Sequence, residues 1–120
     1  MEVLQGYDWW VVAIALVFIV SDFITGIAKA AYNKNVSSTI MRQGLYHKFA
    51  EFMVIVLAVL IDAACVHLEL GFDAPILPVV CAYVVLMEIA SILENLGEIN
   101  PELANSPVFS IFKKGGTRDE

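Results

Sequence analysis

The chain has 120 residues and a formal net charge of −6, and 59% of its residues are hydrophobic. Soluble domains are usually about half apolar, so this composition and a mean hydropathy of +0.75 indicate a membrane protein. The sequence has no basic patch with interleaved aromatic residues, which argues against nucleic acid as a partner.

Three apolar runs are long enough to cross a membrane as helices. They cover residues 9–31, 49–66 and 76–93. A bilayer core about 30 Å thick takes roughly 20 helical residues, so the first run is ample and the other two are near the short end. The sequence therefore predicts a single all-α integral membrane domain over residues 1–120 with three transmembrane helices.

The segment before the first span does not resemble a signal peptide. Residues 1–8 are amphipathic and carry Glu2 and Asp8 but no Lys or Arg. The apolar run that follows is too long for a signal peptide, and no A-x-A-like cleavage site comes after it. We therefore expect the first run to remain as a span.

The basic residues predict how the spans are oriented. With three spans, all of them fall on one side, around the loop 32–48 or in the tail 94–120: Lys29, Lys34, Arg42, Lys48, Lys113, Lys114 and Arg118. The turn 67–75 has only acidic charges. The positive-inside rule then places the N-terminus outside, and the first loop and the C-terminus inside.

The inner loop and the tail each have helical signals. Ser37, Ser38 or Thr39 can cap a short cytoplasmic helix that begins near Ile40 and continues into the second span. In the tail, apolar residues are followed by basic ones: Val108, Ile111, Phe112, Lys113 and Lys114. Such a segment can lie on the inner membrane surface, and a frayed, solvated tail is the alternative.

Each span carries polar or small residues on one helical face. In the first span these are Asp22, Thr25 and Lys29. In the second they are Gly44, Lys48, Glu51, Ile55, Ala58 and Asp62. In the third they are Glu88, Ser91 and Asn95, with Glu94 beside them. Residues three and four apart share a helical face, and charges inside a span must face other helices or water. Asp22 and Lys29 are too far apart for an ideal ion pair, so we expect each to have a partner on another helix.

This polar seam has two interpretations. In the first, Asp22, Lys48, Glu51, Asp62 and Glu88 pair with one another and lock a closed bundle in register. In the second, the seam faces water in a homo-oligomer, because three helices cannot enclose a useful pore and a ring of identical chains can. The acidic excess near Asp62, Glu88 and Glu94 then favours cations.

Other groupings of reactive residues are weak. Cys65 and Cys81 can be drawn as a disulfide near the outer face, but buried free thiols are the expected state. His67, Glu69 and Asp62 can be drawn as a metal site, but the turn geometry is unspecified, and we expect no metal or other cofactor. The sequence has no P-loop, G-x-S-x-G or H-E-x-x-H motif, so we do not expect an enzyme.

Four motifs in series resemble the phage holin family, the group that includes toxin-secretion and phage-lysis holins. They are D-F-I-T-G-I-A-K-A at 22–30, S-S-x-x-x-R-x-G-x-x-x-K at 37–48, I-D at 61–62, and E-x-x-S-I-L-E-N at 88–95 followed by Pro101. The similarity covers the chain from about Ser21 to Phe112. The tail departs from the family pattern, since it reads GEINPEL where a G-x-P-x-P-like turn is common.

The resemblance implies a small multi-pass protein of the bacterial inner membrane. Such a protein oligomerises, permeabilises the membrane, and so releases an endolysin or a toxin and lyses the cell. It implies two classes of partner, other copies of the chain and the lipid bilayer, with a functional link to the endolysin or toxin. We assign Thr25, Gly26 and Gly44 to close helix packing. Arg42 and Lys48 are assigned to the inner interface, with Glu94 as a possible partner.

Two other function classes stay open. The chain can be a small oligomeric ion or proton channel or a transporter subunit, in which Asp22 or Glu88 titrates. It can also be a structural adaptor whose partner docks on the inner loop or the tail. A conductance that never passes proteins favours the first alternative, and no conductance at all favours the second.

Overall fold

The computed structural model describes residues 9–71 and 75–116 of the chain, and these residues form helices and short connections without a strand. Three helices are long: α2 (Trp9–Tyr32), α3 (Ser38–His67) and α4 (Ile76–Ile99). Two short helices, α5 (Pro101–Ala104) and α6 (Pro107–Gly116), follow in the tail. The predicted amphipathic segment 1–8 and Arg118 lie outside the described residues.

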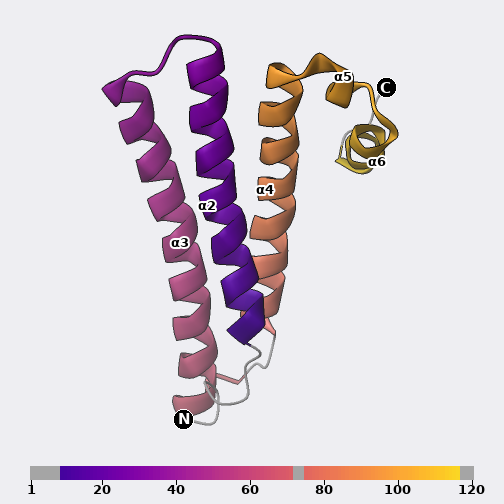
Figure 1. Ribbon diagram of the computed structural model, residues 1–120. Helices are drawn as coiled ribbons and strands as arrows, with labels where there is room; N and C mark the ends of the chain where they lie inside the picture. Colours follow the sequence, from indigo (N-terminus) through magenta and orange to yellow (C-terminus); the bar gives the residue numbers. More distant parts are fainter. Residues whose placement is uncertain (1–8, 72–74, 117–120) are drawn as a thin grey trace.

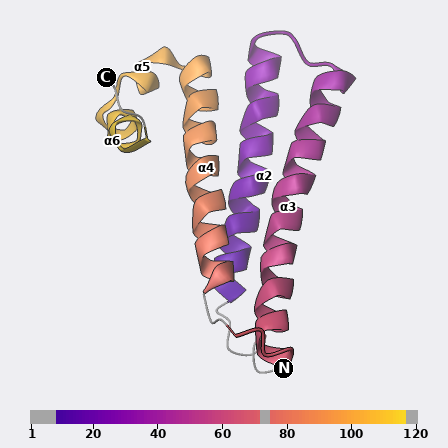
Figure 2. The same cartoon turned by 180° about the vertical axis from the view of Figure 1, so that it is seen from behind.

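The long helices run alternately up and down as a bundle (Figures 1 and 2). Each of the three is long and apolar enough to cross a membrane, which confirms the predicted all-α, three-span architecture. One end of the bundle holds the loop 33–37 and the tail helices, and we call it the loop end. The other end holds the start of α2 and residues 68–71, and we call it the turn end. Lys29, Lys34, Arg42 and Lys48 all lie in the half of the bundle nearer the loop end.

The connection from α2 to α3 is shorter than the predicted loop 32–48, because both helices are well terminated. Lys34 has a φ of 60°, and the amides of Lys34 and Asn35 donate to the carbonyls of Ala31 and Ala30, which is the Schellman arrangement. The Ser37 hydroxyl then accepts a hydrogen bond from the Ile40 amide at 3.1 Å and caps α3. The predicted inner helix is thus the beginning of α3.

An apolar core fills the turn-end half of the bundle. Its buried members come from all three long helices: Ala15, Ile19, Ile55, Ala58, Leu77, Cys81 and Val84. Helix α2 packs more extensively against α4 than against α3. Cys65 and Cys81 are free thiols; Cys81 is buried as expected, whereas Cys65 is half-buried. Large apolar side chains on the outer faces, such as Val17, Leu57 and Leu86, are exposed in the isolated chain, as lipid-facing residues are.

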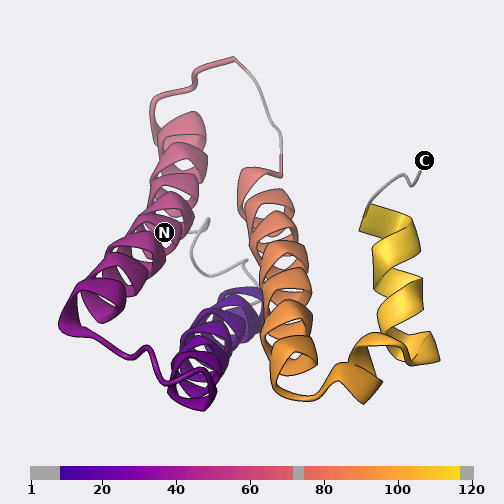
Figure 3. The same cartoon turned by 90° about the horizontal axis from the view of Figure 1, so that it is seen from above.

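The tail is folded back against α4. A Cβ added at Gly97 lies only 3.1 Å from the ring of Phe109 and 3.3 Å from Ala104, so glycine permits this contact. Phe109 is buried, whereas Val108 and Ile111 on the same helix are exposed. Helix α6 is seen nearly end-on in Figure 1 and lengthwise in Figure 3, so it lies across the direction of the long helices. The predicted basic side chains Lys113 and Lys114 are outside the described side chains.

Candidate functional site

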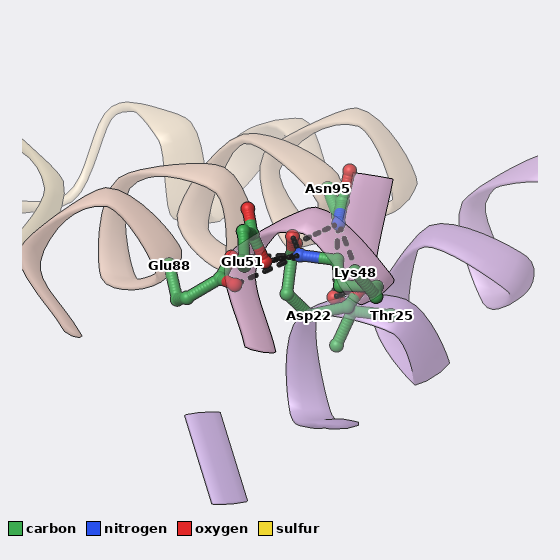
Figure 4. A network of polar contacts seen from close by, with 6 residues as sticks. All are labelled: Asp22, Thr25, Lys48, Glu51, Glu88 and Asn95. Carbon is green, nitrogen blue, oxygen red and sulfur yellow. Dashed lines mark hydrogen bonds and ion pairs between the residues drawn. The ribbon is translucent and has the colours of Figure 1, made fainter. Parts of the chain in front are cut away.

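Lys48 of α3 is the centre of a polar cluster that joins all three long helices (Figure 4). Its Nζ lies 2.6 Å from Asp22 Oδ2 on α2 and 2.9 Å from both carboxylate oxygens of Glu88 on α4. It also donates to Glu51 Oε1 at 3.0 Å, one turn along its own helix. One ammonium group therefore connects α3 to α2 and α4 at the same level.

Asn95 adds a second bridge between α4 and α2. Its Nδ2 donates to Asp22 Oδ1 at 3.0 Å and to Thr25 Oγ1 at 2.9 Å. The Thr25 hydroxyl donates in turn to the Asp22 carbonyl at 3.0 Å. Both carboxylate oxygens of Asp22 are thus occupied by different helices, which fixes how far α2 can slide along its neighbours.

The charges of the cluster are buried but do not balance. The side chain of Glu88 is 2% exposed, that of Asp22 9% and that of Lys48 15%. Three carboxylates surround one ammonium group, so negative charge is in excess when all four groups are ionised. Charged groups within a membrane are tolerated where they pair with one another or line a water-filled cavity.

An open cavity of about 750 Å³ lies beside the cluster and extends to the loop end. The four charged residues of the cluster line it, together with Asn33 and Asn35 from the loop. From Asp22 to the end of α2 at Tyr32 is about 15 Å at 1.5 Å per helical residue. The cavity thus connects the cluster, from well inside the bundle, to the surface at the loop end.

Two further polar pairs lie outside the cluster. Asp62, buried near the turn end, accepts a hydrogen bond at 3.2 Å from the Leu77 amide in the first turn of α4. Helix α4 has no side-chain cap of its own, since Pro75 is its N-cap, so Asp62 supplies that acceptor from α3. Lys29 lies 3.9 Å from Glu98 at the loop end. Asp22 and Lys29 thus have separate partners on other helices.

The remaining predicted site residues lie around the cavity or on the surface. Ser91 and Glu94 line the cavity, and Glu94 is exposed. Arg42 is exposed on α3. Within the described part of the chain, neither Arg42 nor Lys48 forms an ion pair with Glu94. The Lys48 ammonium pairs with the three carboxylates of the cluster instead.

Of the two predicted packing glycines, only Gly44 is tightly confined. A Cβ at Gly44 lies 3.2 Å from the Phe23 ring, whereas one at Gly26 meets Asn95 at an ordinary 3.7 Å. Gly44 thus lets α3 approach α2 one turn before Lys48. The sequence analysis did not assign Gly97 or its contact with Phe109. The available signal was a glycine in the last turns of the third span, followed by an aromatic residue in the tail.

The described residues include no candidate metal site. No group of three His, Cys, Asp or Glu side chains there is placed to hold a metal ion. The carboxylates that lie nearest to one another contact the Lys48 ammonium group.

The fold and the cluster together define a class, a multi-pass membrane protein whose spans are joined through a buried charged centre. Residues 1–106 match the bacteriophage holin family, and the chain belongs to that family. This confirms the resemblance seen in the sequence, and it assigns the chain to a membrane-permeabilising, non-enzymatic group of proteins. The matched residues include all three long helices.

A similar curated protein gives no further guidance on function. An uncharacterized protein of Halalkalibacterium halodurans is 26% identical over 95 residues, which cover 78% of this chain and 70% of the relative. No solved structure matches the chain.

Proposed function

We propose that this protein is a holin that oligomerises in the bacterial inner membrane and permeabilises it. The observation that carries the proposal is the family match over residues 1–106, which spans the whole three-helix bundle. Permeabilisation then allows an endolysin or a toxin to leave the cytoplasm, and lysis follows.

The bundle supports an assembly of several chains rather than a pore within one chain. The polar groups of the three helices are paired with one another around Lys48, and the turn-end half is filled by apolar side chains. A bundle of three helices packed in this way is too small to hold a protein-sized passage. A protein-sized opening therefore needs several copies of the chain. Identical chains usually assemble with closed symmetry, as in a ring.

We further propose that the loop end faces the cytoplasm. Lys29, Lys34, Arg42 and Lys48 all lie toward this end, and the positive-inside rule assigns it to the inner leaflet. Helix α6 lies at the same end across the axes of the spans, with Val108 and Ile111 exposed. This placement suits a helix that rests on the inner membrane surface.

Induction in a bacterial host that carries a cytoplasmic lytic enzyme tests the proposal. Membrane potential is followed with a dye, and release of the enzyme is followed in the same culture. We expect an abrupt loss of potential together with enzyme release, whereas a control three-span membrane protein at equal amounts gives neither. Loss of potential without enzyme release would favour a small channel over a holin. No change in either quantity, with the protein present in the membrane, would favour the structural adaptor.

A further inference from the structure

The first turns of α3 are held to the rest of the bundle at very few points. Residues 38–50 are exposed except at Gly44 and Lys48, which are half-buried. The buried residues of α3, namely Ile55, Ala58 and Asp62, all lie beyond Lys48 toward the turn end. The apolar core therefore fixes only the turn-end half of this helix.

At the loop end the cavity separates α3 from α2 and α4. Its lining includes Ile40, Met41 and His47 of α3, and all three side chains are exposed. In Figure 1 the three long helices spread apart from one another toward this end. The only charged contacts that cross from α3 here are those of Lys48 to Asp22 and Glu88, among the described residues.

We propose that the contacts of Lys48 with Asp22 and Glu88 are a latch that keeps α3 on the bundle, and that α3 leaves α2 and α4 at the loop end before the membrane is permeabilised. Separation uncovers polar groups of all three helices, which a second copy of the chain can then pair. The apolar core at the turn end acts as the hinge. This inference rests on the proposed function for its consequence, but the movement itself can be measured separately.

Two matched substitutions of carboxylates that pair between helices test the latch in cells. Glu88→Gln weakens a contact that joins α3 to α4, whereas Glu98→Gln weakens the contact with Lys29, which joins α2 to α4 and does not involve α3. We expect Glu88→Gln to lower the amount of protein in the membrane at which potential is lost to about half or less, because the closed state alone loses a contact. Glu98→Gln should leave that amount unchanged.

A stronger variant and a pair with exchanged charges complete the series. Asp22→Asn with Glu88→Gln removes both charged partners on other helices and leaves Lys48 paired with Glu51, so no buried charge is left alone. Lys48→Glu with Glu88→Lys exchanges the two charges and keeps the number of each. We expect the first pair to act earlier than Glu88→Gln alone, and the exchanged pair to act later than Lys48→Glu alone, because only the exchanged pair restores an ion pair between α3 and α4.

Distances between spin labels in lipid nanodiscs report the movement without any lysis. The labels replace the exposed residues Ala28 and Leu45 at the loop end, or Val17 and Leu57 nearer the turn end, in a Cys65→Ser, Cys81→Ala background. In Asp22→Asn with Glu88→Gln, a longer distance should appear between positions 28 and 45, and the 17–57 distance should not change. If that pair does not accumulate, Glu88→Gln is compared with Glu98→Gln in the same way.

The outcomes separate the latch from the proposed function. An unchanged 28–45 distance in the latch variants, or equal timing for Glu88→Gln and Glu98→Gln, would overturn the latch. A lengthened distance in a protein whose wild type never depolarises cells would keep the latch and reject the holin.

Discussion

At the scale of single residues, Lys48 and its three carboxylates are not equivalent. Removal of Lys48 leaves the three carboxylates without their cation, whereas removal of one carboxylate leaves the ammonium with two partners. An uncompensated charge in a buried site is far more costly than the loss of one contact. Lys48 is thus the residue on which the local structure depends most.

We expect Lys48→Met to destabilise the protein by about 3 kcal/mol or more, the range for removing one member of a buried charged pair. Glu88→Gln should cost about 1 kcal/mol, because a neutral hydrogen bond replaces a charge-assisted one. Thermal unfolding in detergent, followed by circular dichroism, measures both. The expected order fails if the two variants unfold at the same temperature, or if Glu88→Gln is the less stable.

Asp62 offers a separate test at the turn end. Asp62→Ala removes the acceptor of the Leu77 amide and should cost about 1–2 kcal/mol, as loss of a helix cap does. Asp62→Asn keeps an acceptor oxygen and should cost less than half as much. Hydrogen exchange of the first turn of α4 localises the effect, and equal losses for the two variants would show that the charge, not the cap, matters.

At the scale of the elements, α3 is held in two different ways along its length. Its turn-end half is packed in the apolar core, and its loop-end half approaches α2 at Gly44 against Phe23. At about 1.5 Å per residue, its 30 residues extend about 45 Å, which exceeds a bilayer core of about 30 Å. Its first turns therefore project beyond the hydrocarbon when the rest spans it.

Gly44 tests this division. Gly44→Ala adds a Cβ that Phe23 accommodates by a small shift, and the gain in helix propensity, about 1 kcal/mol, offsets that strain. Gly44→Leu is too large for the gap and should push the loop-end half of α3 outward. We expect earlier loss of membrane potential for Gly44→Leu only. Gly26→Ala is the control, since its site has ordinary space.

The tail provides a further prediction at this scale. Phe109→Ala removes the buried ring that holds α6 against Gly97 and Ala104. The tail should become readily cleaved by a protease, while the long helices keep their protection from hydrogen exchange. Val108→Ala, at an exposed position on the same helix, is the control. Equal cleavage of both variants would mean that Phe109 does not fix α6.

The sequence was sufficient for the helices and insufficient for how they meet. Apolar run lengths predicted three spans, and Ser37 predicted the start of α3, because both depend on local chemistry. Three-and-four spacing placed Asp22, Lys48 and Glu88 on facing stripes. It could not bring these three to one level, because the axial offset between helices depends on the turns and on close contacts such as Gly44 against Phe23.

At the scale of the whole molecule, the bundle is asymmetric along its length. One half has a continuous apolar core, and the other has a buried charged centre beside an open cavity. A closed bundle explains how the isolated chain satisfies its charges. Under the proposed latch, the same groups become available to other copies of the chain when the loop-end half opens, and the two interpretations of the polar seam then describe two states rather than two proteins.

The most direct test of this account uses the purified protein in sealed lipid vesicles. The vesicles hold a small fluorescent dye and a labelled protein of enzyme size, and release of each is followed as the amount of reconstituted protein is raised. The account predicts release of both above a threshold amount, since several chains must assemble. Release of the dye alone at every amount, or retention of both, would contradict it.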